Sequence, residues 1–265
     1  MSADAPDQGA PVFPAWGAAK ETLLFLWTHK SWFLMRALLP AVLVGVTFIV
    51  TFPRLGVYAV WEIALFLISA LFLSNMAVSS HRLAIAGDPC NRFADFLPRV
   101  ADLTYFGLWL ALTMAKWALD FVGTLLASMV ALAGQVFDLG AAILFLLVLV
   151  RLIALFPLVA MRAKTPFHAA WKLSAGQVGR LVTFCFIVAI VLIAGLAAMA
   201  ALVFYSQAWL AANMAGDGVT KMAQELTTTV PFFIAALFVM LVLEAVAVAQ
   251  SVAYRHLVSG ADSAR

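Results

Sequence analysis

The stretch LVTFCFIVAIVLIAGLAAMAALVFYSQAWL, residues 181–210, contains no Asp, Glu, Lys or Arg. A transmembrane helix needs about 20 predominantly apolar residues to cross roughly 30 Å of hydrocarbon, so this stretch is long enough to span a bilayer. The rest of the chain has the same character, because 65% of its 265 residues are hydrophobic and 11% are charged. A soluble domain is about half apolar and a quarter charged. The sequence therefore predicts an integral membrane protein.

Five further segments meet the same criterion of length and apolarity. The six predicted spans are residues 34–52, 57–83, 103–133, 139–161, 181–210 and 229–257. Short turns at 52–56 (FPRLG) and 134–138 (GQVFD) would return the chain at one face of the membrane. We therefore expect an all-α, polytopic domain over residues 15–258, with disordered tails at 1–14 and 259–265.

The distribution of Lys and Arg predicts the orientation of these spans. With six spans, twelve of the sixteen Lys and Arg residues fall on the side of the two termini and two fall on the opposite side. Cytoplasmic loops carry an excess of Lys and Arg, so both termini are predicted to be cytoplasmic. The basic pI of about 9.0 therefore reflects the topology of the chain. We expect the cytoplasmic Lys and Arg residues to contact anionic lipid headgroups. Nucleic acid is not an expected partner, because the sequence has no basic run with interleaved aromatic residues.

Two segments outside the spans are expected to lie at the cytoplasmic surface as short interfacial helices. Thr165 is a good N-cap and Pro166 suits the first helical position. The basic residues that follow recur at helical spacing, which is typical of an amphipathic surface helix; the alternative is a plain loop. The segment 15–31 has a similar pattern. The side chains predicted to face lipid headgroups are Lys164, His168, Lys172, Arg180, His81 and Arg82.

Charged residues inside the spans require an explanation, because each costs roughly 2.5–3.5 kcal/mol at the bilayer centre. The predicted buried charge cluster consists of Glu62, Lys116, Asp120, Arg151 and Glu244. We expect Lys116 to pair with Asp120 along one helix, and Arg151 to bridge to Glu244 or Glu62. Such a cluster is either an ionic knot that holds helices together or a proton or ion relay. Asn75 is expected to hydrogen-bond between helices.

Motifs that carry chemistry are missing from the sequence. It contains no GxSxG, P-loop or GxGxxG followed by an acidic residue. Its four histidines have no HExxH or HxxxH spacing, and its two cysteines have no CxxC partner. We therefore predict no catalytic, cofactor or metal site, and we expect that the protein is not an enzyme.

The segment RLIALFPLVAMRAKTPFHAAWKLSAGQVGRLVTF, residues 151–184, resembles one found in the YciC-like and glycerophosphodiester phosphodiesterase membrane-domain families. Those families have an intramembrane Arg, a Pro about a turn and a half later, and a short amphipathic segment before the next span. The corresponding residues here are Arg151, Pro157, Ala170, Lys172, Ser174 and Gly176. The resemblance implies a multi-spanning protein of the bacterial inner membrane. It implies no hydrolase activity, because the phosphodiesterase activity of such proteins lies in a separate catalytic domain.

Two functional hypotheses follow from the sequence. The first is a non-enzymatic structural, accessory or envelope-homeostasis protein of the inner membrane that contacts anionic lipid and acts with a protein partner or as a homo-oligomer. The alternative is a small proton- or ion-coupled transporter that uses the buried charge cluster. Access of water to that cluster distinguishes the two.

Overall fold

The computed structural model describes residues 12–51, 59–88, 99–213 and 221–263. This part of the chain is all-helical, with 90% of its residues in helices and no strand. The helices are α1 Ala15–Thr28, α2 Lys30–Thr51, α3 Ala59–Ala86, α4 Val100–Met129, α5 Ala131–Arg151, α6 Leu155–Ala160, α7 Pro166–Leu173, α8 Val178–Asn213 and α9 Lys221–Ser263. The six long helices α2, α3, α4, α5, α8 and α9 follow the six apolar segments of the sequence in order.

Four helices in the described ranges are long and apolar enough to cross a membrane. They are α4, α5, residues 178–202 of α8 and residues 233–261 of α9. The chain therefore has the helices of a multi-pass membrane protein.

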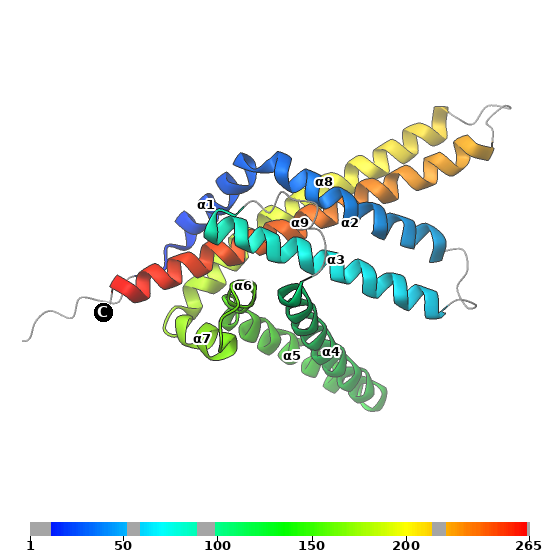
Figure 1. Cartoon of the computed structure of the whole chain (residues 1–265). Helices are drawn as coiled ribbons and strands as arrows, with labels where there is room; N and C mark the ends of the chain where they lie inside the picture. The colour runs from blue at the N-terminus through cyan, green and yellow to red at the C-terminus, as the bar shows by residue number, and fades with distance from the viewer. Residues whose placement is uncertain (1–11, 52–58, 89–98, 214–220, 264–265) are drawn as a thin grey trace, which may run out of the picture.

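The long helices form three hairpins, α2–α3, α4–α5 and α8–α9, which fan out from a common base (Figure 1). The short helices α1, α6 and α7 and the C-terminal end of α9 lie at that base (Figure 1). Helix α9 is the centre of the fold, since it packs against α1, α2, α3 and α8. In the α4–α5 hairpin the two helices pack most extensively against each other, and less extensively against α3, α6 and α8.

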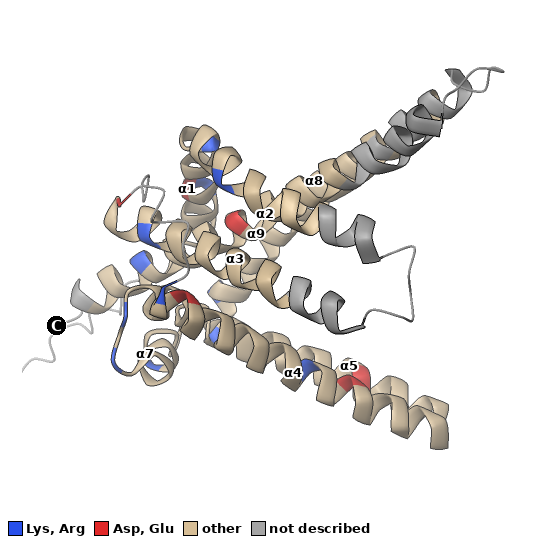
Figure 2. Cartoon of the chain, turned by 45° about the vertical axis from the view of Figure 1, so that its right-hand side comes forward, with Lys and Arg blue, Asp and Glu red and all other residues tan. Residues whose placement is uncertain are grey.

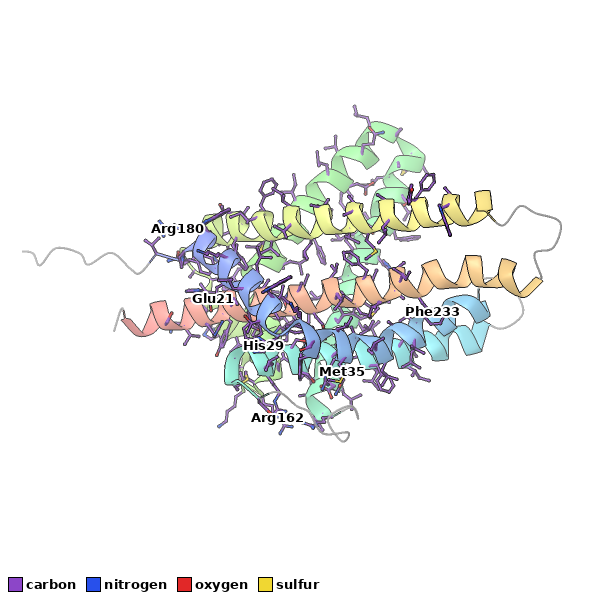
Figure 3. The ribbon with its side chains drawn as sticks, turned by 90° about the horizontal axis from the view of Figure 1, so that it is seen from above. Glu21, His29, Met35, Arg162, Arg180 and Phe233 are labelled. Atoms are coloured by element: carbon purple, nitrogen blue, oxygen red, sulfur yellow. The ribbon has the colours of Figure 1, made fainter. Side chains whose placement is uncertain are left out.

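Small side chains allow the other helices to approach α9 closely. Ala247, Val248, Val252 and Ala253 of α9 are at most 1% exposed. Without bulky groups at these positions, helix backbones can pack at short distances in a membrane. At the far end of the α2–α9 contact, the ring of Phe233 lies directly against Gly45, where a Cβ would collide with it. Figure 3 shows Phe233 between the two helices.

The structure divides the predicted span 139–161 into two helices. Helix α5 ends at Arg151, and α6 begins at Leu155. Pro157 has no backbone N–H for the Ile153 carbonyl, so a continuous helix would lose a hydrogen bond there and its ring would clash with the preceding turn. All six residues of α6 are buried, and the helix packs against α3, α4 and α7.

The turn predicted at 134–138 is misplaced. The chain reverses at Val130, which has an extended backbone (φ −144°, ψ 108°), and residues 134–138 belong to α5. Gly134 instead faces Ala127 across the hairpin, and Gly123 faces Asp138. A Cβ at either glycine would collide with the opposite helix, so these glycines permit close packing and do not mark the turn.

The predicted domain boundaries are also too narrow. Phe13 was assigned to the N-terminal tail, but its side chain is buried and packs edge-on against Phe184 and His256. Helix α9 continues to Ser263, so most of the predicted C-terminal tail is helical. Residues 1–11 and 264–265 lie outside the described residues.

Candidate functional site

Positive charge gathers at the base of the fan. Figure 2 shows most of the described Lys and Arg residues there, around α1, α7 and the base ends of α3 and α9. We call this surface the basic end and define it by Lys20, Arg162, Lys164, His168, Lys172 and Arg180, all of which are exposed. Arg162 and Arg180 project from the base in Figure 3.

Helix α7 supplies part of the basic end, and the structure confirms the predicted helix. Thr165 is its N-cap residue and Pro166 occupies the first turn. The helix also exposes two aromatic side chains, Phe167 and Trp171. Basic and aromatic groups therefore share one exposed surface, which is the composition of a helix that lies at a membrane interface.

Helix α1 presents a second such surface. Its small residues Ala18, Ala19 and Thr22 are buried, whereas Trp16 and Trp27 are about 70% exposed (72% and 70%). The ammonium group of Lys30 lies 3.9 Å from the centroid of the Trp27 ring.

An ion pair ties α1 to the end of α9. Glu21 accepts hydrogen bonds from Arg255 and from the Nε2 of His256. Figure 3 shows Glu21 on the side of α1 that faces α9.

A buried polar network joins α2, α3 and α4 behind the basic end. The guanidinium of Arg36 donates to Asn75 Oδ1 (3.0 Å) and to Ser79 Oγ (2.7 Å). Asn75 Nδ2 in turn donates to Asp102 Oδ2 at 2.9 Å. All four side chains are at most 4% exposed. The sequence placed Arg36 among the cytoplasmic charges and missed this network, although the prediction that Asn75 bonds between helices is confirmed.

Local sequence explains why these groups meet. Asn75 and Ser79 are four residues apart on α3 and therefore share one helix face. Asp102 is the third residue of α4 and caps that helix by accepting the Arg99 backbone N–H at 2.6 Å. A capping residue holds the carboxylate in place, and the positive N-terminal end of the helix favours its charge.

Glu244 lies in α9 beside this network. Its side chain is 0% exposed, and neither carboxylate oxygen has a hydrogen-bond partner among the described residues. The charge of Arg36 is close enough to act on it electrostatically. A fully buried ionisable group without a hydrogen bond is costly, so the position of Glu244 requires an explanation.

The structure does not gather the predicted charge cluster at one place. Arg151 ends α5, where its guanidinium lies 4.2 Å from the centroid of the Trp171 ring of α7. Because both oxygens of Glu244 are without partners, the predicted bridge from Arg151 to Glu244 is absent. The side chain of Glu62 lies outside the described residues.

The predicted pair of Lys116 and Asp120 is confirmed, but it is not buried. The two side chains form an ion pair one turn apart on α4. They are 40% and 53% exposed, since α4 faces outward over most of its length. The prediction that the two residues pair is therefore right, but the prediction that the pair is buried is wrong.

The prediction that His81 faces lipid headgroups is also wrong. Its ring is 0% exposed, lies beside Tyr105 and has Nδ1 2.7 Å from Ser251 Oγ of α9. The neighbouring Arg82 is partly exposed and pairs with Asp88 at 2.8 Å. Successive residues of a helix point about 100° apart, so adjacent positions on α3 can lie in different environments.

Groups that could hold a metal ion do not come together in the described ranges, where no cluster of three or more His, Cys, Asp or Glu occurs. Comparison of the chain with protein-family models, with curated proteins and with solved structures finds no match. The candidate sites are therefore the basic end and the buried group of Arg36, Asn75, Asp102 and Glu244.

Proposed function

We propose that the chain is a six-span protein of the bacterial inner membrane, with both termini in the cytoplasm. In this proposal it has a structural or accessory role in the envelope and no catalytic activity. Its basic end contacts anionic lipid. One observation carries the proposal: helices α1 and α7 expose basic and aromatic side chains at the same end of the molecule.

Two physical effects support contact between this surface and lipid. Trp side chains favour the membrane–water interface, and Trp16, Trp27 and Trp171 are all exposed at the base. Each Lys or Arg near an anionic leaflet contributes about 1 kcal/mol of attraction. The two effects act at the same end of the molecule, so they favour one orientation.

Several of the residues on which the proposed resemblance to the YciC-like family rests lie together around Arg151. Ser174 Oγ donates to the Arg151 carbonyl at 2.8 Å. Pro157 stands where the helix breaks, and Trp171 of the amphipathic segment covers the Arg151 side chain. The residues that carry the resemblance therefore form one local structure.

Lipid-dependent stability tests the proposal. The full chain is placed in nanodiscs of phosphatidylcholine alone or with phosphatidylglycerol, and thermal unfolding is followed. Phosphatidylglycerol should raise Tm for the wild type, and much less for the triple variant Lys164→Gln/Lys172→Gln/Arg180→Gln. The control Arg54→Gln/Lys221→Gln removes charge from the predicted outer side and should keep the full shift. An equal shift in all three proteins would refute a lipid contact at the basic end.

The second candidate is a small proton- or ion-coupled transporter, and Glu244 is the observation that favours it. Intramembrane carboxyl groups often take part in proton relays. Proteoliposomes with an internal pH dye would report proton entry under an imposed membrane potential. Entry that Glu244→Gln abolishes would support the transporter. No entry, together with normal folding of Glu244→Gln, would favour the accessory role.

A further inference from the structure

A partly open cleft of about 350 Å³ lies between the α4–α5 hairpin and α9. Its walls are mainly aromatic and aliphatic, with Trp109 and Trp117 from α4, Phe145 from α5 and Phe156 from α6. Three polar side chains, Thr113, Lys116 and Gln250, also line it. The Thr113 hydroxyl already donates to the Trp109 carbonyl. Helices α4 and α5 are long and apolar enough to lie in a bilayer. In that position hydrocarbon would surround the cleft, and an occupant would enter from the membrane.

The polar groups of the cleft define what an occupant must offer. Gln250 lines the cleft, and its Oε1 is buried without a hydrogen-bond partner among the described residues. A turn of the terminal amide toward the cleft would let this oxygen accept a hydrogen bond from a donor there. The Lys116 ammonium has three N–H groups and uses one on Asp120, so it can serve an additional acceptor. A hydroxyl group is both donor and acceptor, and therefore satisfies both side chains.

Charge complementarity argues against an anionic occupant. Asp120 already neutralises Lys116, and a carboxylate or phosphate beside that pair would meet the repulsion of the aspartate in a medium of low dielectric constant. An ionised carboxylate also has no proton to donate to Gln250.

We propose that this cleft binds a neutral single-chain lipid with a hydroxylated head group, the chemistry of a monoacylglycerol. The cleft lies near the lower end of the range of small-molecule sites, about 300–1,000 Å³. It accommodates the head group and the start of one acyl chain, and the remainder of the chain lies in the bilayer. The proposal requires only that α4 and α5 lie in a membrane, so it is independent of lipid contact at the basic end.

Photocrosslinking tests the site. The full chain in detergent micelles is irradiated with a monooleoylglycerol that carries a diazirine near the head of its acyl chain, and the modified peptides are identified by mass spectrometry. Labelling should fall on α4, α5 or the part of α9 around Gln250. Unlabelled monooleoylglycerol should compete at least tenfold better than methyl oleate, which lacks a donor, and than oleate, which is anionic.

Two variants form a matched pair. Leu149 lines the cleft, so Leu149→Trp should fill it and reduce labelling at least fivefold. Leu147 is on the same helix, outside the lining and 40% exposed, so Leu147→Trp should leave labelling unchanged. Gln250→Leu should remove the preference for monooleoylglycerol over methyl oleate while the protein stays folded. Labelling that is indifferent to Leu149→Trp, or equal competition by all three lipids, would show annular lipid only and overturn the proposal, as would an absence of labelling.

Discussion

Helix α9 and both helices of the α4–α5 hairpin are apolar enough to cross a membrane, but they differ in burial. In the most apolar part of α9, 39% of residues are buried, against 6% in α4 and 11% in α5. Hydropathy alone therefore identifies helices that can enter a membrane, but it does not distinguish the centre of the fold from its periphery. Residue size and polar side chains make that distinction.

Helix α9 has small residues on several faces and packs most extensively against α1, α2, α3 and α8, whereas α4 and α5 carry large apolar side chains outward. Trp117, Phe121 and Leu144 are each about 60% exposed (59%, 64% and 63%). In a bilayer such side chains contact lipid at no cost. The buried network of Arg36 belongs to the packed region, and the exposed pair of Lys116 and Asp120 belongs to the hairpin. Substitutions in the two regions should therefore have very different effects.

The largest effect is expected from Arg36→Leu. It removes the guanidinium that donates to Asn75 Oδ1 and Ser79 Oγ, and with it the buried cation of the network that continues to Asp102. Breaking a buried charged network by removing one partner costs about 3–5 kcal/mol. We expect loss of most folded protein, measured by size-exclusion chromatography after detergent extraction. A normal yield and an unchanged Tm would show that the network does not hold the helices.

A pair of Ala→Leu substitutions compares packing in the two regions directly. Ala253 of α9 is 0% exposed, so Ala253→Leu should cost about 1–3 kcal/mol by overpacking. Ala142 of α5 is exposed, so Ala142→Leu should leave Tm within error of the wild type. Thermal unfolding in detergent measures both, and equal effects would remove the distinction between centre and periphery.

The pair on α4 gives a smaller effect when both charges are removed together. Lys116→Leu alone leaves an unpaired carboxylate at membrane depth, at a cost of roughly 2.5–3.5 kcal/mol. The double variant Lys116→Leu/Asp120→Leu should lower stability by less than about 1 kcal/mol, since replacing an ion pair in a low-dielectric medium by apolar side chains is often neutral or stabilising. The amount of membrane-inserted protein is measured for the two variants. If the double variant inserts as little as the single one, the ion pair itself is required for stability.

The smallest effect is expected where α1 meets α9. Glu21→Gln removes the charge that Arg255 and His256 share, but the side chains involved are partly exposed. The cost should be at most about 1 kcal/mol, with faster proteolysis within α1 and an unchanged global Tm. Unchanged proteolysis would mean that the buried Ala18 and Ala19 alone hold α1.

Apolar segments were sufficient to predict the long helices, because 20-residue apolar runs have few structural alternatives. The interfacial helix from Pro166 was also predictable, since its cap and its basic spacing are local signals. The break before Leu155 could have been inferred from Pro157, whereas the turn at Val130 has no comparable sequence signal.

The polar core could not be predicted from depth alone. Placing charges by their distance along each span grouped Arg151 with Glu244, but rotation about the helix axis decides which side chains meet. That rotation separates His81, which is buried, from Arg82, which is partly exposed. It also brings Arg36, near the start of its span, to Asn75 and Asp102, a pairing that depends on how three helices pack.

Cysteine accessibility tests the six-span account most directly. In a background with Cys90→Ser and Cys185→Ala, single cysteines replace Val130 at the α4–α5 turn, Ala175 after α7 and Ser259 near the end of α9, all of them exposed. Intact cells and inverted membrane vesicles are treated with a membrane-impermeant maleimide. The account predicts that positions 175 and 259 react only in inverted vesicles and that position 130 reacts only in intact cells. Reaction of position 130 from the same side as position 259 would contradict it, because the α4–α5 hairpin would then not cross the membrane.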